Sequence, residues 1–406
     1  MTDTDLRSEM KPTTCLLVVT AIRNRSNSYI TDWLAAFKRR TDLQIVHVDV
    51  LKAGSGRRLT KALRQVDATV LLHSVTADSL KPAATLKPFL MDRKSPVVVL
   101  LGNEINLPWA PLSEKIQFLA DVGADVVGTQ LLEGAGQYLY ADTGARVLSV
   151  PHAVDPRQFR FQQPSKRLEL RIGTRTARYL PIIGDQDRPR FLDAVAATAA
   201  RRGWTIDISD NRFVSGKWSE YLASLDVTIS TEAGSFFTEP SDALVTEILD
   251  FVRLRNRTTS IPVSGVVSDL VRRMPWQLRQ WLRRTMPRSI VTNDLKLLED
   301  APADEILELF FSRKERSPEY TKALSSRHVE AASVGTPQLL LEGRYNDVLI
   351  PDVHYGSVSS DLSNLETLLD RLSDFDERRR MAESARTHVE QFHTLDHRID
   401  RIRSEL

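Results

Sequence analysis

The chain has 406 residues, of which 42% are hydrophobic and 27% charged, so it is long enough for two or three globular domains. Its 55 basic and 53 acidic residues leave a net charge of +2, which argues against a dedicated nucleic-acid-binding protein. A single cysteine, Cys15, excludes an intramolecular disulfide and suits a reducing compartment. CxxC and HExxH motifs are absent, so we expect no metal and no cofactor.

The ends and apolar runs of the sequence bear on its location in the cell. The first residues, MTDTDLRSEMKPTT, are polar and lack the apolar core of a secretory signal. The longest apolar runs, such as residues 97–101, have the length of a strand and fall short of the roughly 18 residues of a membrane span. We therefore expect a cytoplasmic protein, with peripheral contact at the inner face of the membrane left open.

In the first half, apolar β-branched runs alternate with amphipathic helical patterns. Such alternation predicts βαβ units and a parallel sheet, and hence a Rossmann-like domain over residues 1–160. The domain is expected to end near 151–156, a segment bracketed by prolines. The predicted strands are 15–21, 43–50, 68–75, 96–103, 124–129 and 145–151, and the predicted helices include 28–40 and 57–66.

The same pattern restarts in the second half and predicts a second Rossmann-like domain over residues 161–385. Between about 240 and 325 the pattern is helical, which predicts a helical insert in this domain. Residues 386–406 are expected to form a C-terminal helix that packs back on the N-terminal domain. The predicted strands are 169–174, 204–209, 225–231 and 337–343, and the predicted helices are 190–202, 328–334, 361–372 and 376–392.

The segment 325–337, SSRHVEAASVGTP, has the pattern of a short helix at a strand end. Ser326 is a candidate N-cap, and Gly335 fits the left-handed position that ends a helix. Glu330 could accept hydrogen bonds from a ribose while the amides of the first turn face a diphosphate. The alternative is that Glu330 only interacts favourably with the helix dipole.

Three segments together resemble GT-B glycosyltransferases, and most closely a bacterial group related to spore-maturation CgeB-like proteins. They are RHVEAASVGTPQLLLEGRYNDVLIPDVHYG from residue 327, HVEQFHTLDHRIDRI at 388–402, and VLSVPHAVDPRQF at 147–159. The resemblance implies an α/β, GT-B-like fold, with two Rossmann-like domains whose parallel sheets face a cleft. The first domain would then bind the acceptor and the second the nucleotide-sugar.

The resemblance also implies donor-binding residues in the second domain. Glu330 matches the second Glu of an E-x7-E motif that binds the nucleotide ribose, whereas the first Glu falls on Lys322. Arg175 follows the first strand, where such enzymes place a cation for the diphosphate, and an arginine fork suits phosphate oxygens. The remaining expected donor residues are Ser326, Arg327, Gly335 and Thr336, together with Glu232, Gly234 and Ser235 of a corner that resembles an EAGS motif.

Candidate catalytic and acceptor residues lie in the first domain. Glu104 follows the fourth predicted strand and would be the base of an inverting reaction, or else a solvated loop carboxylate. His152 would line the cleft, or else be a buried structural histidine. Asn24, Arg25 and Asn103 also follow predicted strands and are candidates for acceptor contacts.

The segment 272–288, RRMPWQLRQWLRRTMPR, has six arginines, two tryptophans and no acidic residue. This composition suits an interfacial helix on an anionic membrane. The alternative is a helix that packs its tryptophans while the arginine stems cover the surface.

These observations favour a glycosyltransferase that moves a sugar from a nucleotide-diphosphate donor to an acceptor hydroxyl. The acceptor would be a glycan, a lipid-linked intermediate or a small molecule. Two alternatives stay open: a sugar-nucleotide 2-epimerase of the same fold, and a non-catalytic module that binds a nucleotide-sugar. The missing first Glu of the motif is what keeps the non-catalytic alternative open.

Overall fold

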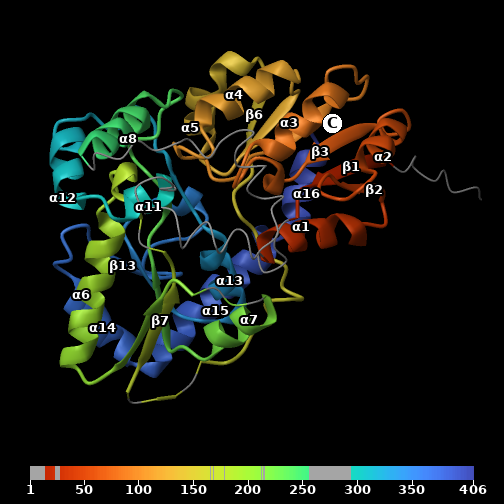
Figure 1. Cartoon of the computed structure of the whole chain (residues 1–406). Helices are drawn as coiled ribbons and strands as arrows, with labels where there is room; N and C mark the ends of the chain where they lie inside the picture. Colours follow the sequence, from red (N-terminus) through yellow and green to blue (C-terminus); the bar gives the residue numbers. More distant parts are fainter. Residues whose placement is uncertain are drawn as a thin grey trace, which may run out of the picture.

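The computed structural model describes residues 14–22, 28–164, 166–167, 169–177, 179–211, 213, 215–255 and 294–406. These residues form two α/β units, each built on a parallel sheet, and helix α13 lies between them (Figure 1). The predicted α/β class with two parallel sheets is therefore confirmed.

The first unit contains a six-stranded parallel sheet in the order β2-β1-β3-β4-β5-β6. Leu17 and Val19 of β1 belong to one apolar cluster, and Leu16 and Val18 belong to another, so helices cover both faces of the sheet. This is why its strands read as continuous apolar runs. The strands are β1 (Thr14–Thr20), β2 (Leu43–Asp49), β3 (Ala68–Leu71), β4 (Val97–Leu100), β5 (Val126–Thr129) and β6 (Arg146–Ser149); the helices are α1 (Ser28–Arg39), α2 (Ser55–Ala62), η1 (His73–Val75), α3 (Lys81–Leu90), α4 (Leu112–Asp121), α5 (Glu133–Tyr140) and η2 (Ala141–Thr143).

The second unit contains a five-stranded parallel sheet in the order β13-β12-β9-β7-β8 and a separate antiparallel pair, β10-β11. Its strands are β7 (Arg171–Arg175), β8 (Thr205–Ser209), β9 (Val227–Ser230), β10 (Ala233–Gly234), β11 (Lys322–Ala323), β12 (Gln338–Leu341) and β13 (Gly356–Val358). The helices around the sheet are η3 (Pro181–Ile183), α6 (Asp187–Arg201), α7 (Ser215–Ala223), α13 (Ser326–Val334), η5 (Tyr345–Asp347), α14 (Leu365–Ser373) and α15 (Phe375–Phe392).

Between β10 and β11 the described chain contains several helices joined by irregular segments. It forms α8 (Ala243–Arg255), α11 (Asp294–Glu299), α12 (Ala303–Ile306) and a π-helical turn, η4 (Leu307–Phe311). Apolar side chains of α8, α11 and η4 share one cluster with η3. The segment 272–288 lies outside the described residues.

Two helices end the chain, where the sequence predicted one helix over 386–406. Helix α15 stops at Phe392, and Thr394 begins a capping box with His397 at the start of α16 (Leu395–Arg403). Helix α16 packs against α1, and Leu395 and Ile399 belong to the apolar cluster of the first unit (Figure 1).

The two units also meet at the β4–α4 loop. The side-chain amide of Asn106 donates to the carbonyls of Glu239 and Ser241 and, at 2.8 Å, to Oδ1 of Asp242. The Asp242 carboxylate in turn accepts from the backbone N–H groups that begin α4, which fixes the insert of the second unit to the first.

Within the ranges that the structure describes, no helix is both long and apolar enough to cross a membrane.

Candidate functional site

The carboxyl ends of β7, β9 and β12 and the start of α13 meet at the edge of the second sheet that faces the first unit. In open parallel α/β sheets, ligands bind beyond the carboxyl ends of strands, where helix N-termini present unpaired N–H groups. This edge is therefore the candidate site.

Helix α13 begins with a capping box in which a histidine takes the place of the usual glutamate. The N-cap is Ser325, one residue before the predicted Ser326, and its backbone N–H donates to Nδ1 of His328 at 3.1 Å. Because Nδ1 accepts, the neutral imidazole carries its proton on Nε2. Burial, and then the charge of Arg327, lowers the pKa of His328 to about 3, so the ring is neutral near pH 7.

The buried Nε2–H of His328 faces the backbone of Thr231 at the corner after β9, and this contact acts to raise the pKa of the ring. His328 therefore links the start of α13 to that corner. The unpaired backbone N–H groups of the first turn of α13 remain suited to an anionic oxygen of a ligand.

One turn further along α13, Glu330 is 3% exposed. The indole Nε1–H of Trp218 on α7 donates to Glu330 Oε2 at 2.7 Å. The charge of Glu330 also affects the pKa of Asp32, which lies on α1 across the domain boundary. Burial first and the charge of Glu330 second raise the pKa of Asp32 to about 7.

His152 of the first unit lies near the start of α13, and His73 lies beside it. His152 follows β6, and its ring stacks on that of His73 with centroids 6.2 Å apart. Burial, and then the charges of Arg327 and Arg398, lowers the pKa of His152 to about 4. The structure thus brings the predicted residues His152 and Arg327 to the same boundary; the catalytic role of His152 stays a prediction.

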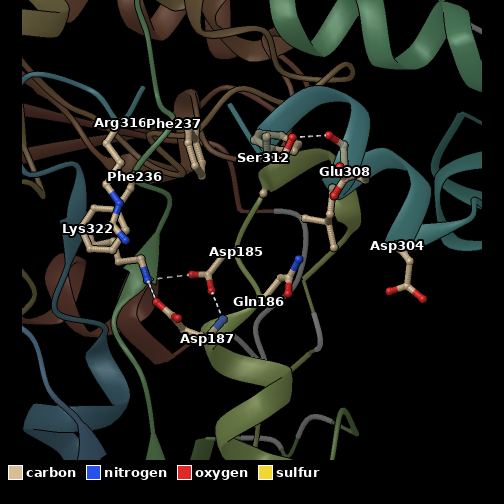
Figure 2. Close-up of a pocket in the computed structure, with 13 residues that line it drawn as sticks. Asp185, Gln186, Asp187, Phe236, Phe237, Asp304, Glu308, Ser312, Arg316 and Lys322 are labelled. Atoms are coloured by element: carbon tan, nitrogen blue, oxygen red, sulfur yellow. Dashed lines mark hydrogen bonds and ion pairs between the residues drawn. The ribbon is translucent and has the colours of Figure 1, made fainter. Parts of the chain in front are cut away.

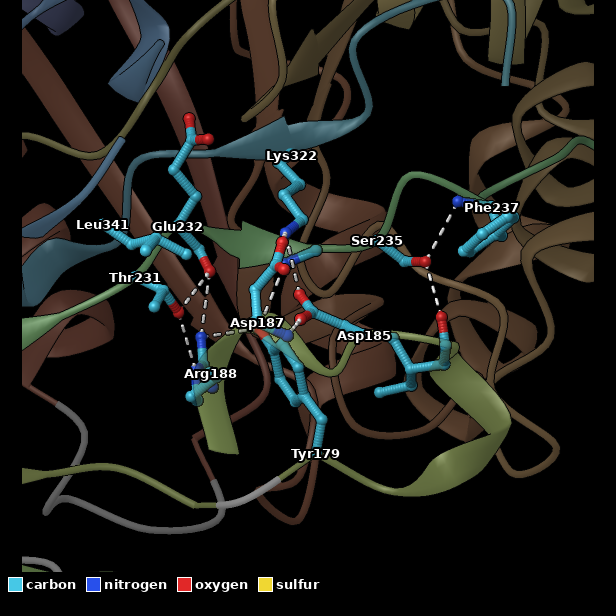
Figure 3. A network of polar contacts seen from close by, with 12 residues as sticks. Tyr179, Asp185, Asp187, Arg188, Thr231, Glu232, Ser235, Phe237, Lys322 and Leu341 are labelled. Atoms are coloured by element: carbon cyan, nitrogen blue, oxygen red, sulfur yellow. Dashed lines mark hydrogen bonds and ion pairs between the residues drawn. The ribbon is translucent and has the colours of Figure 1, made fainter. Parts of the chain in front are cut away.

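The predicted corner after β9 is fixed by a buried arginine (Figure 3). Arg188 donates from Nε to Thr231 Oγ1 at 3.1 Å and from Nη2 to the Glu232 carbonyl at 3.0 Å. Gly234 has φ 100°, and a Cβ there would lie 2.7 Å from the Thr321 carbonyl, so the corner requires glycine. The hydroxyl of Ser235 donates to the Ile183 carbonyl at 2.6 Å. These contacts give the corner a fixed shape.

The side chain of Glu232 is buried and bonds to other parts of the site. Its Oε1 accepts from the backbone N–H of Tyr345 at 2.6 Å, and its Oε2 accepts from the Tyr320 hydroxyl. Burial raises the pKa of Glu232. This carboxylate therefore holds the loop after β12 to the corner after β9.

Lys322, at the position of the first Glu of the motif, is paired with two carboxylates (Figure 2). Its Nζ lies 3.0 Å from Asp185 Oδ2 and 2.9 Å from Asp187 Oδ2, and also 4.4 Å from the centroid of Phe236. These side chains line a cavity of about 350 Å³.

Asp304, Glu308 and Arg316 complete the charged lining of this cavity, so that four carboxylates and two basic groups face it. A lining with an acidic excess and aromatic rings suits hydroxyl groups and the apolar face of a sugar better than a diphosphate. Across the described ranges, no group of three or more His, Cys, Asp or Glu side chains could hold a metal ion.

The guanidinium of Arg175 contacts β8 and α7. It pairs with Asp207 at 2.8 Å, donates to the Tyr221 hydroxyl at 2.8 Å, and lies 4.2 Å from the centroid of that ring. These contacts stabilise the second unit, and a phosphate-binding role for Arg175 stays a prediction.

Gly335 and Thr336 follow the last residue of α13, and Gly335 stands ten residues after the N-cap Ser325, about 15 Å along the helix at about 1.5 Å per residue. Gly335 packs against Phe161, and Thr336 donates to the Leu222 carbonyl at 2.9 Å. The structure therefore does not bring these two residues together with the start of α13.

Glu104 is 5% exposed and accepts hydrogen bonds from Thr129 Oγ1, Gln130 N and Tyr140 OH at 2.6 to 2.7 Å. Burial raises its pKa. All of these donors belong to the first unit, so the arrangement favours a structural role over that of a base. Asn103, next to it, is exposed and has φ 50°. Asn24 and Arg25 lie outside the described residues.

Comparison with known proteins gives one family match. Residues 303–404, about a quarter of the chain, match the family model described as glycosyl transferase-like. No curated protein matches the sequence.

Several solved structures are similar over nearly the whole chain. Alr3699/HepE from Anabaena, in complex with UDP and glucose, is 11% identical, covers 96% of this chain and 99% of its own, and has a TM-score of 0.47. A glycosyltransferase from Rickettsia africae ESF-5 is 9% identical, with 97% and 98% covered and a TM-score of 0.48. An alpha,alpha-trehalose-phosphate synthase (UDP-forming) from Burkholderia vietnamiensis is 10% identical, with 97% and 98% covered and a TM-score of 0.42.

Sequence reasoning missed several residues of the site. Trp218 and Asp32 lie within amphipathic helices, and nothing in their local pattern separates them from ordinary helix residues. His328 stands inside the segment that carries the resemblance, yet only the structure shows that it replaces the glutamate of a capping box.

Proposed function

We propose that this chain is a glycosyltransferase that transfers a sugar from a nucleotide-diphosphate donor to an acceptor hydroxyl. The start of α13 is the observation that carries the proposal. It combines a helix N-terminus whose first backbone N–H groups are free of intrahelical partners, the buried neutral ring of His328, and a buried carboxylate one turn further on. The match of residues 303–404 to a glycosyl transferase-like family supports it, because this range contains the whole of α13.

In this proposal, each part of the donor has a partner of suitable chemistry. The first-turn amides of Ser326 and Arg327 bind the diphosphate, and Glu330 accepts from the ribose hydroxyls. The cavity beside Lys322 suits a neutral sugar unit. During transfer, the bond from the sugar to the diphosphate breaks, a bond to the acceptor oxygen forms, and the acceptor proton passes to a base.

His152 is our candidate for that base, because its neutral imidazole lies at the domain boundary near Arg327. Its lowered pKa of about 4 makes it a weaker base than a free histidine, so a base role requires that substrate binding raise this pKa. We further propose that the chain belongs to the CgeB-like group. Contact of residues 272–288 with an anionic membrane, a cytoplasmic location and a role in glycan synthesis are proposals that follow from the sequence.

The decisive experiment is incubation with UDP-, GDP-, dTDP-, ADP- and CMP-linked sugars, followed by mass spectrometry of nucleotides and sugars. Release of the free nucleotide with sugar transfer or hydrolysis is the expected result. An epimerised sugar nucleotide formed without an acceptor would instead favour the 2-epimerase. Binding without any product would favour the non-catalytic module.

A further inference from the structure

The turn Tyr345–Asp347 after β12 has an uncommon backbone. Its three residues have φ of 45°, 53° and 58°, all in the left-handed region. Residues other than glycine visit this region as single residues, because their Cβ crowds the next carbonyl oxygen. Such strain persists only where the surroundings fix the backbone, and it concentrates at functional sites.

Contacts on one side fix this turn to the candidate site. The backbone N–H of Tyr345 donates to Glu232 Oε1 at 2.6 Å, and that of Arg344 donates to the Tyr320 hydroxyl at 3.2 Å. The buried ring of Tyr345 stands edge-on to His328, with centroids 5.0 Å apart. The turn is therefore part of the surroundings of the first turn of α13.

The side chain of Asn346 links the turn to both units. Its Oδ1 accepts from the backbone N–H of Leu324 at 2.6 Å, one residue before the N-cap of α13. Its Nδ2 donates to the carbonyl of Gln130 in the first unit at 2.9 Å. The N–H of Gln130 donates to the buried carboxylate of Glu104, which fixes this corner of the first unit.

We propose that Asn346 is a positioning residue that couples the approach of the two units to the placement of the start of α13. One planar amide holds Leu324 with its oxygen and Gln130 with its nitrogen, so the two bonds form together only when the units are in the observed arrangement. When Gln130 moves away, the strained turn loses one of its fixed points. This inference rests on the proposed donor site at α13.

Asn346→Asp removes the hydrogen bond to Gln130 between the units and keeps the one to Leu324. The aspartate keeps an oxygen for Leu324 and tolerates a left-handed backbone, but it replaces the N–H donor that faces the Gln130 carbonyl. Asn364→Asp is the matched control, because Asn364 accepts from Ser359 N and donates to the Ser357 carbonyl, both at 2.9 Å, within the second unit.

Two measurements test the coupling. The first is the distance distribution between two spin labels. The labels are attached to cysteines that replace the exposed residues Lys94 and Thr367, in a chain whose native cysteine is removed by Cys15→Ala. The second is the affinity for whichever of UDP, GDP, dTDP, ADP and CMP binds the unlabelled wild type. For Asn346→Asp we expect a broadened distribution, since the Asn106 contacts remain, and affinity lower by about fivefold or more. Asn364→Asp should change neither quantity.

Unchanged distances or unchanged affinity in Asn346→Asp would overturn the coupling. Equal effects in Asn364→Asp would also overturn it, because they would show that Asn346 acts only through general stability. A wild type that binds none of the five nucleotides would contradict the donor site itself, and so the failure of the proposed function is distinguishable from that of the coupling.

Discussion

The indole of Trp218 donates a 2.7 Å hydrogen bond to the carboxylate of Glu330, and both side chains are buried. The bond joins α7 to α13 between residues 112 positions apart. Glu330 is therefore oriented by its own domain before any ligand arrives. A pre-oriented acceptor loses little conformational entropy on binding, which favours affinity.

Glu330→Gln tests the ribose-binding role. The change keeps the shape of the side chain and removes its charge, and a hydrogen bond to a charged group is worth about 1.5–3 kcal/mol. We expect nucleotide affinity, measured by calorimetry, to fall at least tenfold. Trp218→Phe keeps the carboxylate and loses only the orienting donor, so it should weaken binding less. Equal affinity of Glu330→Gln and wild type would remove Glu330 from the donor site.

The raised pKa of Asp32 predicts a pH-dependent stability. Because the folded state holds this proton up to about pH 7, the group stabilises the fold below its unfolded pKa near 4, and this contribution is lost as the pH rises to 7. At about 1.4 kcal/mol per pKa unit, the loss is roughly 4 kcal/mol.

Urea unfolding of wild type and Asp32→Asn at pH 5 and pH 8 measures the part of this loss that falls above pH 5, about 3 kcal/mol. The asparagine variant should gain stability relative to wild type as the pH rises. In Glu330→Gln, the transition should move to lower pH, because the charge of Glu330 contributes to the shift. If the unfolding free energies of wild type and Asp32→Asn changed with pH in the same way, the raised pKa of Asp32 would be contradicted.

Arg175→Ala separates a structural role from a phosphate contact. Its guanidinium is bonded to Asp207 and Tyr221, so we expect a loss of about 2 kcal/mol in unfolding free energy. The ratio of UDP to uridine affinity should stay the same. Asp207→Asn is the control that breaks the same pair from the other side. A loss of affinity for UDP but not for uridine would instead support the phosphate contact that the resemblance implies.

Lys322→Glu restores the first Glu of the E-x7-E motif. In this structure it would place a third carboxylate beside Asp185 and Asp187, where the side chains of Lys322 and Asp185 are 5% and 1% exposed. Breaking a buried ion pair costs about 3–5 kcal/mol, so we expect marked destabilisation. Lys322→Met, which removes the charge at similar length, should be less harmful. A stable, more active Lys322→Glu protein would show that the motif position keeps its usual role.

The sequence predicted the sheets well because their strands are buried on both faces and read as continuous apolar runs. Glu330 could be predicted as a candidate from the motif around it, and the corner Glu232–Ser235 from its position after a strand. The actual partners of these residues could not be predicted, because they depend on contacts between distant segments. Trp218, for example, reaches Glu330 across 112 positions, and Asn346 reaches Gln130 across 216.

The position of Arg175 in the sequence also does not show its contacts. It stands at a strand end, as a phosphate contact would, yet Asp207 on the neighbouring strand pairs with it. In the register, Asp207 is paired with Gly173 and so lies diagonally across from this arginine. Nothing in the sequence pattern indicates this neighbour, because the register of two strands separated by a helix is a property of the folded sheet.

The most direct test of the donor site is calorimetric titration of wild type and Glu330→Gln with UDP, GDP, dTDP, ADP and CMP. We expect one nucleotide to bind wild type in a 1:1 complex, and the same nucleotide to bind Glu330→Gln at least tenfold more weakly, as a charge-assisted bond of about 1.5–3 kcal/mol requires. Binding of none of the five to wild type, or equal binding to both proteins, would contradict a nucleotide site at the start of α13.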